Sequence, residues 1–307
     1  MGLTPEEMLA RLLYRDGLML VIDKPAGYAV HRGPKGGEAL EDYFGALRFG
    51  LPRAPALAHR LDRDTSGCLV LGRHRKALAL LGKLFKQGKI GKTYWAVVEG
   101  GPDASEGRID IPLSKRDESR GWWMKADAHG MPSVTMWKVM GRSSPLEGLG
   151  VGVEFARNSR FENAPPPQPS PTRGEGARSA SGDSPPRLTW LALEPLNGRT
   201  HQLRIHCAEM GWPIVGDSIY GAAPRQGGPP LHLHAREIVV PISKNKPPVT
   251  VIAPVPEHIR ELLAACGWKD AAICSAHSRA SGNPEPLAEH PQFVALGPRF
   301  RGDERTN

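Results

Sequence analysis

Short apolar runs bounded by glycine, proline or charged residues recur along the chain, and most of them alternate or are rich in branched side chains. This pattern is typical of strands. It predicts strands at residues 18–23, 67–72, 92–100, 107–113, 133–140, 187–195, 231–241 and 249–253. Apolar residues at helical spacing predict helices at residues 4–14, 38–49, 76–87, 201–211 and 257–266. Thr4 and Thr200 are the predicted caps of the first and fourth helices, and Gly211 ends the fourth.

Residues 142–187 interrupt this pattern. They are rich in proline, serine, glycine and arginine and have almost no apolar periodicity. Such a stretch buries too little apolar surface to offset the entropy lost on ordering, so we predict a disordered insertion at about 156–186. The tail at residues 275–307 has the same composition and is also predicted to be disordered. Because a coherent pattern resumes after the insertion, we interpret it as a long connection within one domain.

Composition adds a bias in charge. The chain has 307 residues, with 40 Lys and Arg against 32 Asp and Glu, and a formal net charge of +8. A basic surplus suits a polyanionic partner. The four cysteines include no Cys-x-x-Cys pair, which argues against a zinc site or a disulfide scaffold and makes a reducing cytoplasm the simplest location. No apolar run approaches the roughly 18 residues that cross a membrane.

The most informative stretch is HRLDRDTSGCLVLG, at residues 59–72. Asp62 lies on the loop just before the predicted strand. The strand gives this loop a rigid support, and the loop exposes the side chain, which is where reactive side chains usually lie. Considered one by one, the residues of this stretch have a simpler interpretation, a turn in which an aspartate forms an ion pair with a neighbouring arginine. The whole string closely resembles the signature of the RluA-type pseudouridine synthases, in which the aspartate of His-Arg-Leu-Asp…Thr-Ser-Gly is catalytic. The resemblance implies that Asp62 is the catalytic carboxylate.

Other stretches carry the same resemblance. KTYWAVVEG, at residues 92–100, is similar to the family's second motif, whose tyrosine stacks on the target base and helps to remove the proton from carbon 5, so Tyr94 is implied in that role. NGRTHQLRIHCAEMGWPIVGDSIYG, at 197–221, resembles the third motif, in which Arg204 would be the arginine that pairs with the catalytic aspartate. The Lys-Pro-x-Gly turn that begins at Lys24 resembles the opening of the catalytic domain.

The resemblance also implies a fold and a reaction. The expected class is α+β, with a central, mostly antiparallel mixed sheet flanked by helices and loops, and with the active cleft along the sheet. The catalytic domain would span 18–270, after an N-terminal helical extension at 1–17. The implied enzyme is an isomerase that flips specific uridines out of ribosomal or transfer RNA and converts them to pseudouridine, as a monomer and without a cofactor. The implied substrate-binding residues are His59, Arg60, Thr65, Arg199 and His201.

The residues leave other functions open. A catalytically silent RNA-binding protein on the same fold is one alternative, and a nucleoside hydrolase with a carboxylate is another. The hydrolase would need a second placed acid, for which Asp64 is the candidate, and it would release free uracil. A metal site is not expected, because His201 and His206 are five residues apart on a helix and point about 140° from each other.

The sequence allows two interpretations for the tryptophan pair and two for the arginines of the insertion and the tail. Trp122 and Trp123 lie among basic residues, where they would either stack on unpaired bases or cover the edge of the core. The arginines of the insertion and the tail are either inert or form arms that bind RNA. The sequence does not reveal which uridine is modified, nor whether Asp62 attacks the ribose, attacks the ring or removes a ribose proton.

Overall fold

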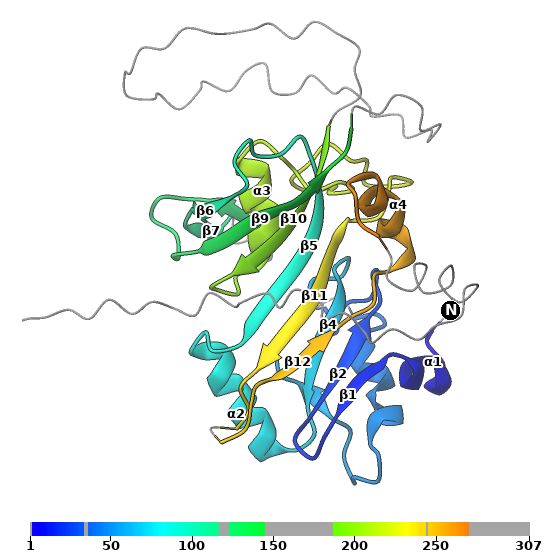
Figure 1. The fold of residues 1–307 in the computed structure, drawn as a ribbon. Coiled ribbons are helices and arrows are strands. Elements are labelled where there is room, and N and C mark those ends of the chain that lie inside the picture. Colours follow the sequence, from blue (N-terminus) through cyan, green and yellow to red (C-terminus); the bar gives the residue numbers. More distant parts are fainter. Residues whose placement is uncertain (1, 34–35, 117–122, 145–186, 244, 270–307) are drawn as a thin grey trace, which may run out of the picture. The chain divides into compact units, whose positions relative to one another are not determined.

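The computed structural model describes residues 2–33, 36–116, 123–144, 187–243 and 245–269 (Figure 1). Residues Met1–Trp268 form one compact unit. The segments predicted to be disordered, at 156–186 and 275–307, lie outside the described residues, as does Trp122. In the part of the chain that is described, no helix is long and apolar enough to cross a membrane.

A ten-stranded mixed sheet organises this unit (Figure 1). Its order is β1-β2-β4-β11-β5-β10-β9-β6, with β12 beside β11 and β3 beside β4. The strands are β1 Leu12–Arg15, β2 Met19–Lys24, β3 Ala56–Leu57, β4 Ser66–Gly72, β5 Gly91–Glu99, β6 Glu106–Asp110, β9 Val134–Arg142, β10 Leu188–Pro195, β11 Leu233–Val240 and β12 Val249–Ile252. A separate hairpin joins β7 Leu113–Lys115 to β8 Met124–Ala126. Within the sheet only β4 and β11 run parallel, which confirms the predicted α+β class and the mostly antiparallel sheet.

The strand β4 follows the loop that carries Asp62. Every residue of β4 is buried, because separate apolar clusters cover its two faces. Gly67, near its start, has a φ of +104°, and a Cβ at this position would lie 2.3 Å from the carbonyl oxygen of Ala235 in β11. Only glycine permits this backbone conformation and approach. The parallel pairing of β4 and β11 is confined to this point, so the preceding residues are free to form a loop.

The helices are α1 Pro5–Ala10, the 3-10 helix η1 Leu40–Leu47, α2 Arg75–Lys86, α3 Gln202–Glu209 and α4 Glu257–Ala265. The first begins as predicted, because the Thr4 hydroxyl accepts from the Glu7 N–H and the Glu7 carboxylate accepts from the Thr4 N–H. Its predicted extent to residue 14 is wrong. Residues 12–15 form β1 and pair with β2, so long-range sheet pairing overrides the local helical pattern.

The start of α3 also differs from the prediction. Its N-cap is His201, which has a φ of +55° and makes no capping bond through its side chain, so Thr200 is not the cap. The predicted end is confirmed, because Gly211 has a φ of +81° just after the last turn. The left-handed conformation of His201 turns the chain sharply before the helix begins, which sets the direction of its side chain.

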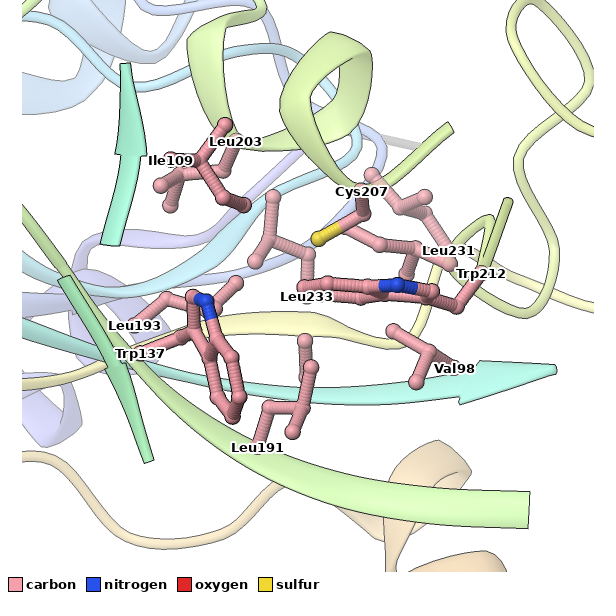
Figure 2. Close-up of a cluster of buried hydrophobic side chains, with 12 residues drawn as sticks. Val98, Ile109, Trp137, Leu191, Leu193, Leu203, Cys207, Trp212, Leu231 and Leu233 are labelled. Carbon is pink, nitrogen blue, oxygen red and sulfur yellow. The ribbon is translucent and has the colours of Figure 1, made fainter. Parts of the chain in front are cut away.

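An apolar cluster packs α3 against the sheet (Figure 2). Its two indoles, Trp137 from β9 and Trp212 after α3, meet edge to face with ring centroids 5.7 Å apart. Tyr94 of β5 packs against this cluster and also against a second one, formed around β2, β4 and η1. Tyr94 therefore lies where two parts of the core meet.

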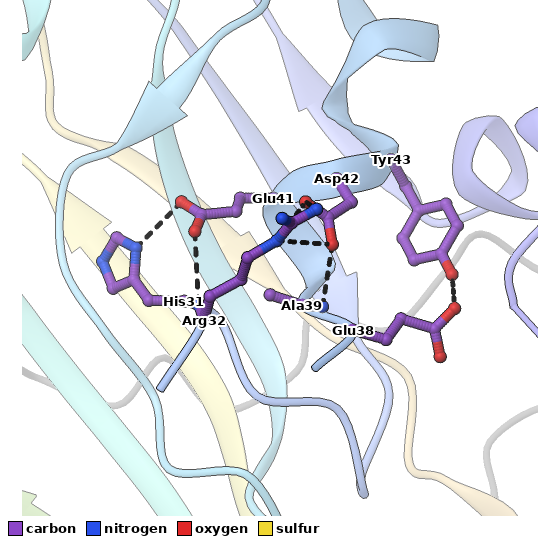
Figure 3. Close-up of polar contacts among 7 residues, drawn as sticks. All are labelled: His31, Arg32, Glu38, Ala39, Glu41, Asp42 and Tyr43. Atoms are coloured by element: carbon purple, nitrogen blue, oxygen red, sulfur yellow. Dashed lines mark hydrogen bonds and ion pairs between the residues drawn. The ribbon is translucent and has the colours of Figure 1, made fainter. Parts of the chain in front are cut away.

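Ion pairs tie the loop after β2 to η1 (Figure 3). Arg32 binds Asp42 at 2.8 Å, and the ring nitrogen Nδ1 of His31 lies 2.9 Å from Glu41. The Asp42 carboxylate also accepts from the Ala39 N–H and so caps the 3-10 helix. These pairs are partly exposed, so they position the loop more than they stabilise the fold.

Candidate active site

Asp62 lies on the loop that precedes β4. The side chain of Leu61, just before it, is buried in the cluster around β2, β4 and η1. The carbonyl of Asp62 accepts from the Thr65 N–H at 3.2 Å, which closes a turn. The Asp62 side chain is 18 % exposed, so it remains within reach of a ligand although the protein shields most of it.

A buried lysine holds this loop from behind. The Lys24 ammonium donates to the carbonyls of Pro25 at 2.8 Å, Arg63 at 2.8 Å and Thr65 at 2.9 Å. Its side chain is fully buried at the end of β2. Burial lowers the pKa of Lys24 to about 7, and the charges of Asp64 and Asp62 oppose that shift. Lys24 therefore fixes the backbone of the loop that carries the carboxylates.

Tyr94 enters the site from β5. Burial raises the pKa of its phenol, and the negative charge of Asp62 raises it further. The two side chains are therefore close enough to interact electrostatically. At neutral pH the Tyr94 hydroxyl keeps its proton.

Arg204, on α3, has a different partner from the predicted one. Its guanidinium donates two bonds of 2.7 Å to the carboxylate of Asp217, and both side chains are buried. Asp217 also accepts from the N–H groups of Ile219 and Tyr220 at 2.9 Å. Burial acts to raise the pKa of Asp217, and the guanidinium and backbone donors outweigh it, so the pKa is lowered. The hydrogen bonds of Arg204 thus go to Asp217, whereas its predicted pairing with Asp62 is present only as an interaction of the two charges through space.

Among the described residues, His201 is the one whose basic side chain lies within 4.0 Å of the Asp62 carboxylate. Its Nε2 lies 3.9 Å from Oδ2 of Asp62, and its Nδ1 lies 2.9 Å from the hydroxyl of Tyr220. The Tyr220 hydroxyl in turn accepts from the Met124 N–H at 3.3 Å, which connects β8 to the site. Burial lowers the pKa of His201, partly offset by the charge of Asp62, so the ring is neutral at pH 7.

One pocket of ≈ 90 Å³ brings most of the predicted site residues together. The predicted residues that line it are Arg60, Asp62, Thr65, Tyr94, Arg199, His201 and Arg204. Lys92 and Asn197 also line it and were not predicted. The pocket therefore combines one carboxylate near the surface with an aromatic side chain and several cations.

His59 is the predicted substrate-binding residue that lies outside this pocket. Its Nε2 accepts from the Val70 N–H at 3.0 Å, and its ring stacks on Phe85 of α2 with centroids 4.6 Å apart. Burial lowers the pKa of His59 to about 3. Its contacts are those of a neutral residue that attaches the Asp62 loop to β4 and α2.

Other histidines hold the framework together. The ring of His206 bonds the Thr135 hydroxyl at 2.9 Å and the Ile111 carbonyl at 3.1 Å, as expected for a structural histidine. The ring of His232 donates to the Pro230 carbonyl at 2.8 Å. Within the described ranges, no group of three or more His, Cys, Asp or Glu side chains is arranged to hold a metal ion.

Sequence reasoning missed three residues that shape the site: Lys24, Asp217 and Tyr220. Lys24 was interpreted only as part of a turn. The signal that marks it is a lysine at the end of an apolar strand, directly before proline. Asp217 and Tyr220 stand in the Gly-Asp-x-x-Tyr-Gly segment of the third motif, but the sequence does not say which side chains they meet.

Residues 18–209 match the family described as RNA pseudouridylate synthase. The chain is 35% identical over 254 residues to an uncharacterized RNA pseudouridine synthase of Zymomonas mobilis, an alignment that covers 82% of this chain and 96% of that protein. It is 32% identical over 270 residues to the ribosomal large subunit pseudouridine synthase C of Haemophilus ducreyi, covering 84% and 69% of the two chains.

The fold has known counterparts as well. The structure of human RNA pseudouridylate synthase domain containing 4 aligns with a TM-score of 0.60 at 22% identity, covering 85% of this chain and 95% of that one. Human RNA pseudouridylate synthase domain containing 1 aligns with a TM-score of 0.58 at 23% identity, covering 89% and 96%. The family match and the bacterial relatives confirm the resemblance on which the motifs were interpreted: this chain belongs to the RNA pseudouridylate synthase family and is an isomerase that converts uridine to pseudouridine in RNA.

Proposed function

We propose that the pocket lined by Asp62, Tyr94 and Arg204 holds the uridine that is isomerised, and that Asp62 is the group that reacts. The observation that carries this proposal is the convergence of these side chains. They come from the loop before β4, from β5 and from α3, and they line one pocket. A carboxylate that reacts must keep free lone pairs, and among the described residues none donates a hydrogen bond to the Asp62 side chain.

The reaction itself explains this set of residues. The bond from the ribose to the uracil nitrogen breaks and a bond to carbon 5 forms, while carbon 5 loses a proton and the nitrogen gains one. No electrons are exchanged with a cofactor. Asp62 serves as nucleophile or base. Arg204, held by Asp217, supplies a fixed positive charge nearby without occupying the Asp62 oxygens.

The uridine reaches this pocket by leaving the RNA helix, which costs a few kcal/mol. Stacking of the base on Tyr94 offsets part of that cost, since an aromatic contact contributes about 1–3 kcal/mol. Because its phenol stays protonated, Tyr94 acts as a surface for the base in the resting enzyme. Arg60 and Arg199, which line the same pocket, are suited to bind phosphate.

The end of the β7–β8 hairpin supplies a second contact for RNA. Trp123 has two guanidinium groups near its ring, those of Arg116 at 5.6 Å and Arg225 at 5.3 Å. Met124, the next residue, bonds the Tyr220 hydroxyl and so connects this cluster to the pocket. An aromatic ring near arginines is suited to unpaired bases beside a phosphate backbone.

We further propose that the substrate is ribosomal RNA of the large subunit, in the cytoplasm, with the enzyme acting as a monomer. The names of the relatives from Haemophilus ducreyi and Vibrio cholerae support ribosomal RNA. Transfer RNA is the alternative substrate. The catalytic domain proposed for this function spans residues 18–270, with the insertion at 156–186 and the tail at 275–307 outside the reacting part.

Tritium release tests the proposal. Cellular RNA labelled with tritium at carbon 5 of uridine is incubated with the wild type, with Asp62→Asn and with Asp64→Asn. The Asp62→Asn variant should lose release by about 10³-fold or more. The matched control, Asp64→Asn, changes an exposed carboxylate two residues away and should retain release within about threefold. Fractionation of the RNA identifies the substrate.

Each of three other outcomes would contradict the proposal and favour another function or another reactive group. Release that survives in Asp62→Asn would show that another group reacts. Wild-type binding of RNA without release from any pool would favour the silent RNA-binding protein. Free uracil in the supernatant, with loss of activity in Asp64→Asn, would favour a hydrolase with two carboxylates.

A further inference from the structure

His201 occupies the place that the motif led us to expect for Arg204. The Arg204 guanidinium is bound by both oxygens of Asp217, whereas the Nε2 of His201 points at Oδ2 of Asp62 from 3.9 Å. The His201 side chain is 7 % exposed. The site therefore contains two separate pairs, Arg204 with Asp217 and His201 with Asp62.

Tyr220 determines which nitrogen of His201 carries the proton. Burial raises the pKa of the Tyr220 phenol, so its hydroxyl stays protonated. That oxygen already accepts from the Met124 N–H, and its own proton is free to be donated. Nδ1 of His201 lies 2.9 Å from this oxygen, and we assign it as the acceptor of the Tyr220 proton. In a neutral imidazole whose Nδ1 accepts, Nε2 carries the hydrogen, and it faces Asp62.

The backbone keeps the ring in this place. His201 has a φ of +55° at the N-cap of α3, a left-handed conformation that is strained for a residue with a Cβ. The Ile205 N–H donates to the His201 carbonyl at 3.0 Å, which fastens the residue to the first turn. The orientation is thus set from both ends, by the helix and by Tyr220.

We propose that His201 is a positioning residue that donates its Nε2 hydrogen to Oδ2 of Asp62 and so directs the other carboxylate oxygen toward the uridine. This inference rests on the proposed function. The 3.9 Å separation is longer than a hydrogen bond, and catalytic hydrogen bonds of this kind shorten when substrate is bound. In the part of the chain that the structure describes, the charged and titratable groups that face His201 include Asp62, Asp217, Arg204, Arg60 and Tyr220.

Three variants test the inference: His201→Leu, which removes both nitrogens, His201→Gln, which keeps an N–H near the position of Nε2, and Tyr220→Phe. His201→Leu should lower the single-turnover rate of tritium release about 10²-fold at saturating RNA, with the Kd for RNA within about twofold. Its pH–rate profile should lose activity at a higher pH than the wild type, because the carboxylate lacks the donor that stabilises its charge.

The other two variants separate positioning from folding. His201→Gln should recover at least tenfold of the lost rate, and Tyr220→Phe should lose about tenfold with the same direction of shift in the acidic limb. His31→Gln, at an exposed position, is the control that should match the wild type. Thermal unfolding of every variant shows whether the fold is retained.

Some results would overturn the inference. A weaker Kd with an unchanged saturating rate would assign His201 to phosphate binding. A lower rate with an unmoved acidic limb, and no recovery in His201→Gln, would assign it a structural role. If the wild type releases no tritium, the proposed function itself fails, an outcome that the variants alone cannot imitate.

Discussion

The pocket has two walls, and each depends on a carboxylate of a different kind. One wall is the loop at residues 59–65 with Asp62, and the other is α3, whose Arg204 is held by Asp217 from outside the pocket lining. Asp217 is 1 % exposed and accepts four hydrogen bonds, two from Arg204 and two from backbone N–H groups. Asp62 is 18 % exposed and is held through its backbone, by Lys24 and a turn. A structural carboxylate has both oxygens occupied, whereas the carboxylate proposed to react is positioned mainly through its backbone, which leaves an oxygen free for the substrate.

The largest expected difference between the walls is in stability. Asp217→Asn breaks a buried ion pair and leaves the Arg204 charge uncompensated, so it should lower the free energy of unfolding by about 3–5 kcal/mol. Asp62→Asn removes a carboxylate that makes no hydrogen bond among the described residues, and it should change that free energy by less than about 1 kcal/mol. Urea unfolding of the two variants and the wild type measures both. Equal losses would show that Asp62 is also a structural residue.

The same contrast shows how far the sequence alone leads. Asp62 and Tyr94 could be placed at the site because each stands in a stretch that resembles a motif of the family, Asp62 just before a strand and Tyr94 within one. The partner of Arg204 could not, since Asp62 and Asp217 are both acidic residues and only the tertiary fold decides which one meets the guanidinium. The residue that links His201 to β8 was equally hidden, because Tyr220 acts through a contact with a distant strand.

The limits on predicting the fold have a similar cause. Thr4 and Pro5 correctly mark the start of α1, because capping is local. Its end could not be predicted, since residues 12–15 become a strand only through pairing with β2. Likewise the loop geometry around Asp62 depends on Lys24, a residue far away in sequence whose three bonds go to carbonyl groups that any amino acid would provide.

A smaller effect on the free energy of unfolding should appear in the Asp62 wall when the pH is lowered. His59 backs the Asp62 loop, and its pKa is about 3 in the folded state against about 6.5 when exposed. Between these values the unfolded chain binds the proton and the folded one does not, so this residue makes the protein lose stability as pH falls from about 6.5 toward 3. At pH 5 the loss amounts to about 2 kcal/mol.

The measurement is the free energy of unfolding at pH 7 and at pH 5. In His59→Gln, which keeps an acceptor for the Val70 N–H, the fall between the two pH values should be smaller than in the wild type by about 2 kcal/mol. The exposed His31→Gln should show the wild-type fall. If His59→Gln also retains the full fall, the acid sensitivity arises outside the Asp62 wall, for example from the buried ring of His234, whose pKa burial also lowers to about 3.

The smallest effect distinguishes two arginines within the Asp62 wall itself. Arg60 lines the pocket, whereas Arg63 points its Nε to the carbonyl of Gly27 at 2.9 Å and lies 4.0 Å from Asp64. If Arg60 meets a phosphate, Arg60→Gln should weaken RNA binding about three- to tenfold and reduce the slope of log affinity against log salt by about 1. Arg63→Gln removes the same formal charge from the same loop, and a cation engaged with the protein releases no counterion from RNA, so the slope should stay unchanged. Titration of RNA at several salt concentrations therefore separates a specific phosphate contact from a general effect of net charge. Equal slopes for the two variants would mean that this loop attracts RNA only through its summed charge.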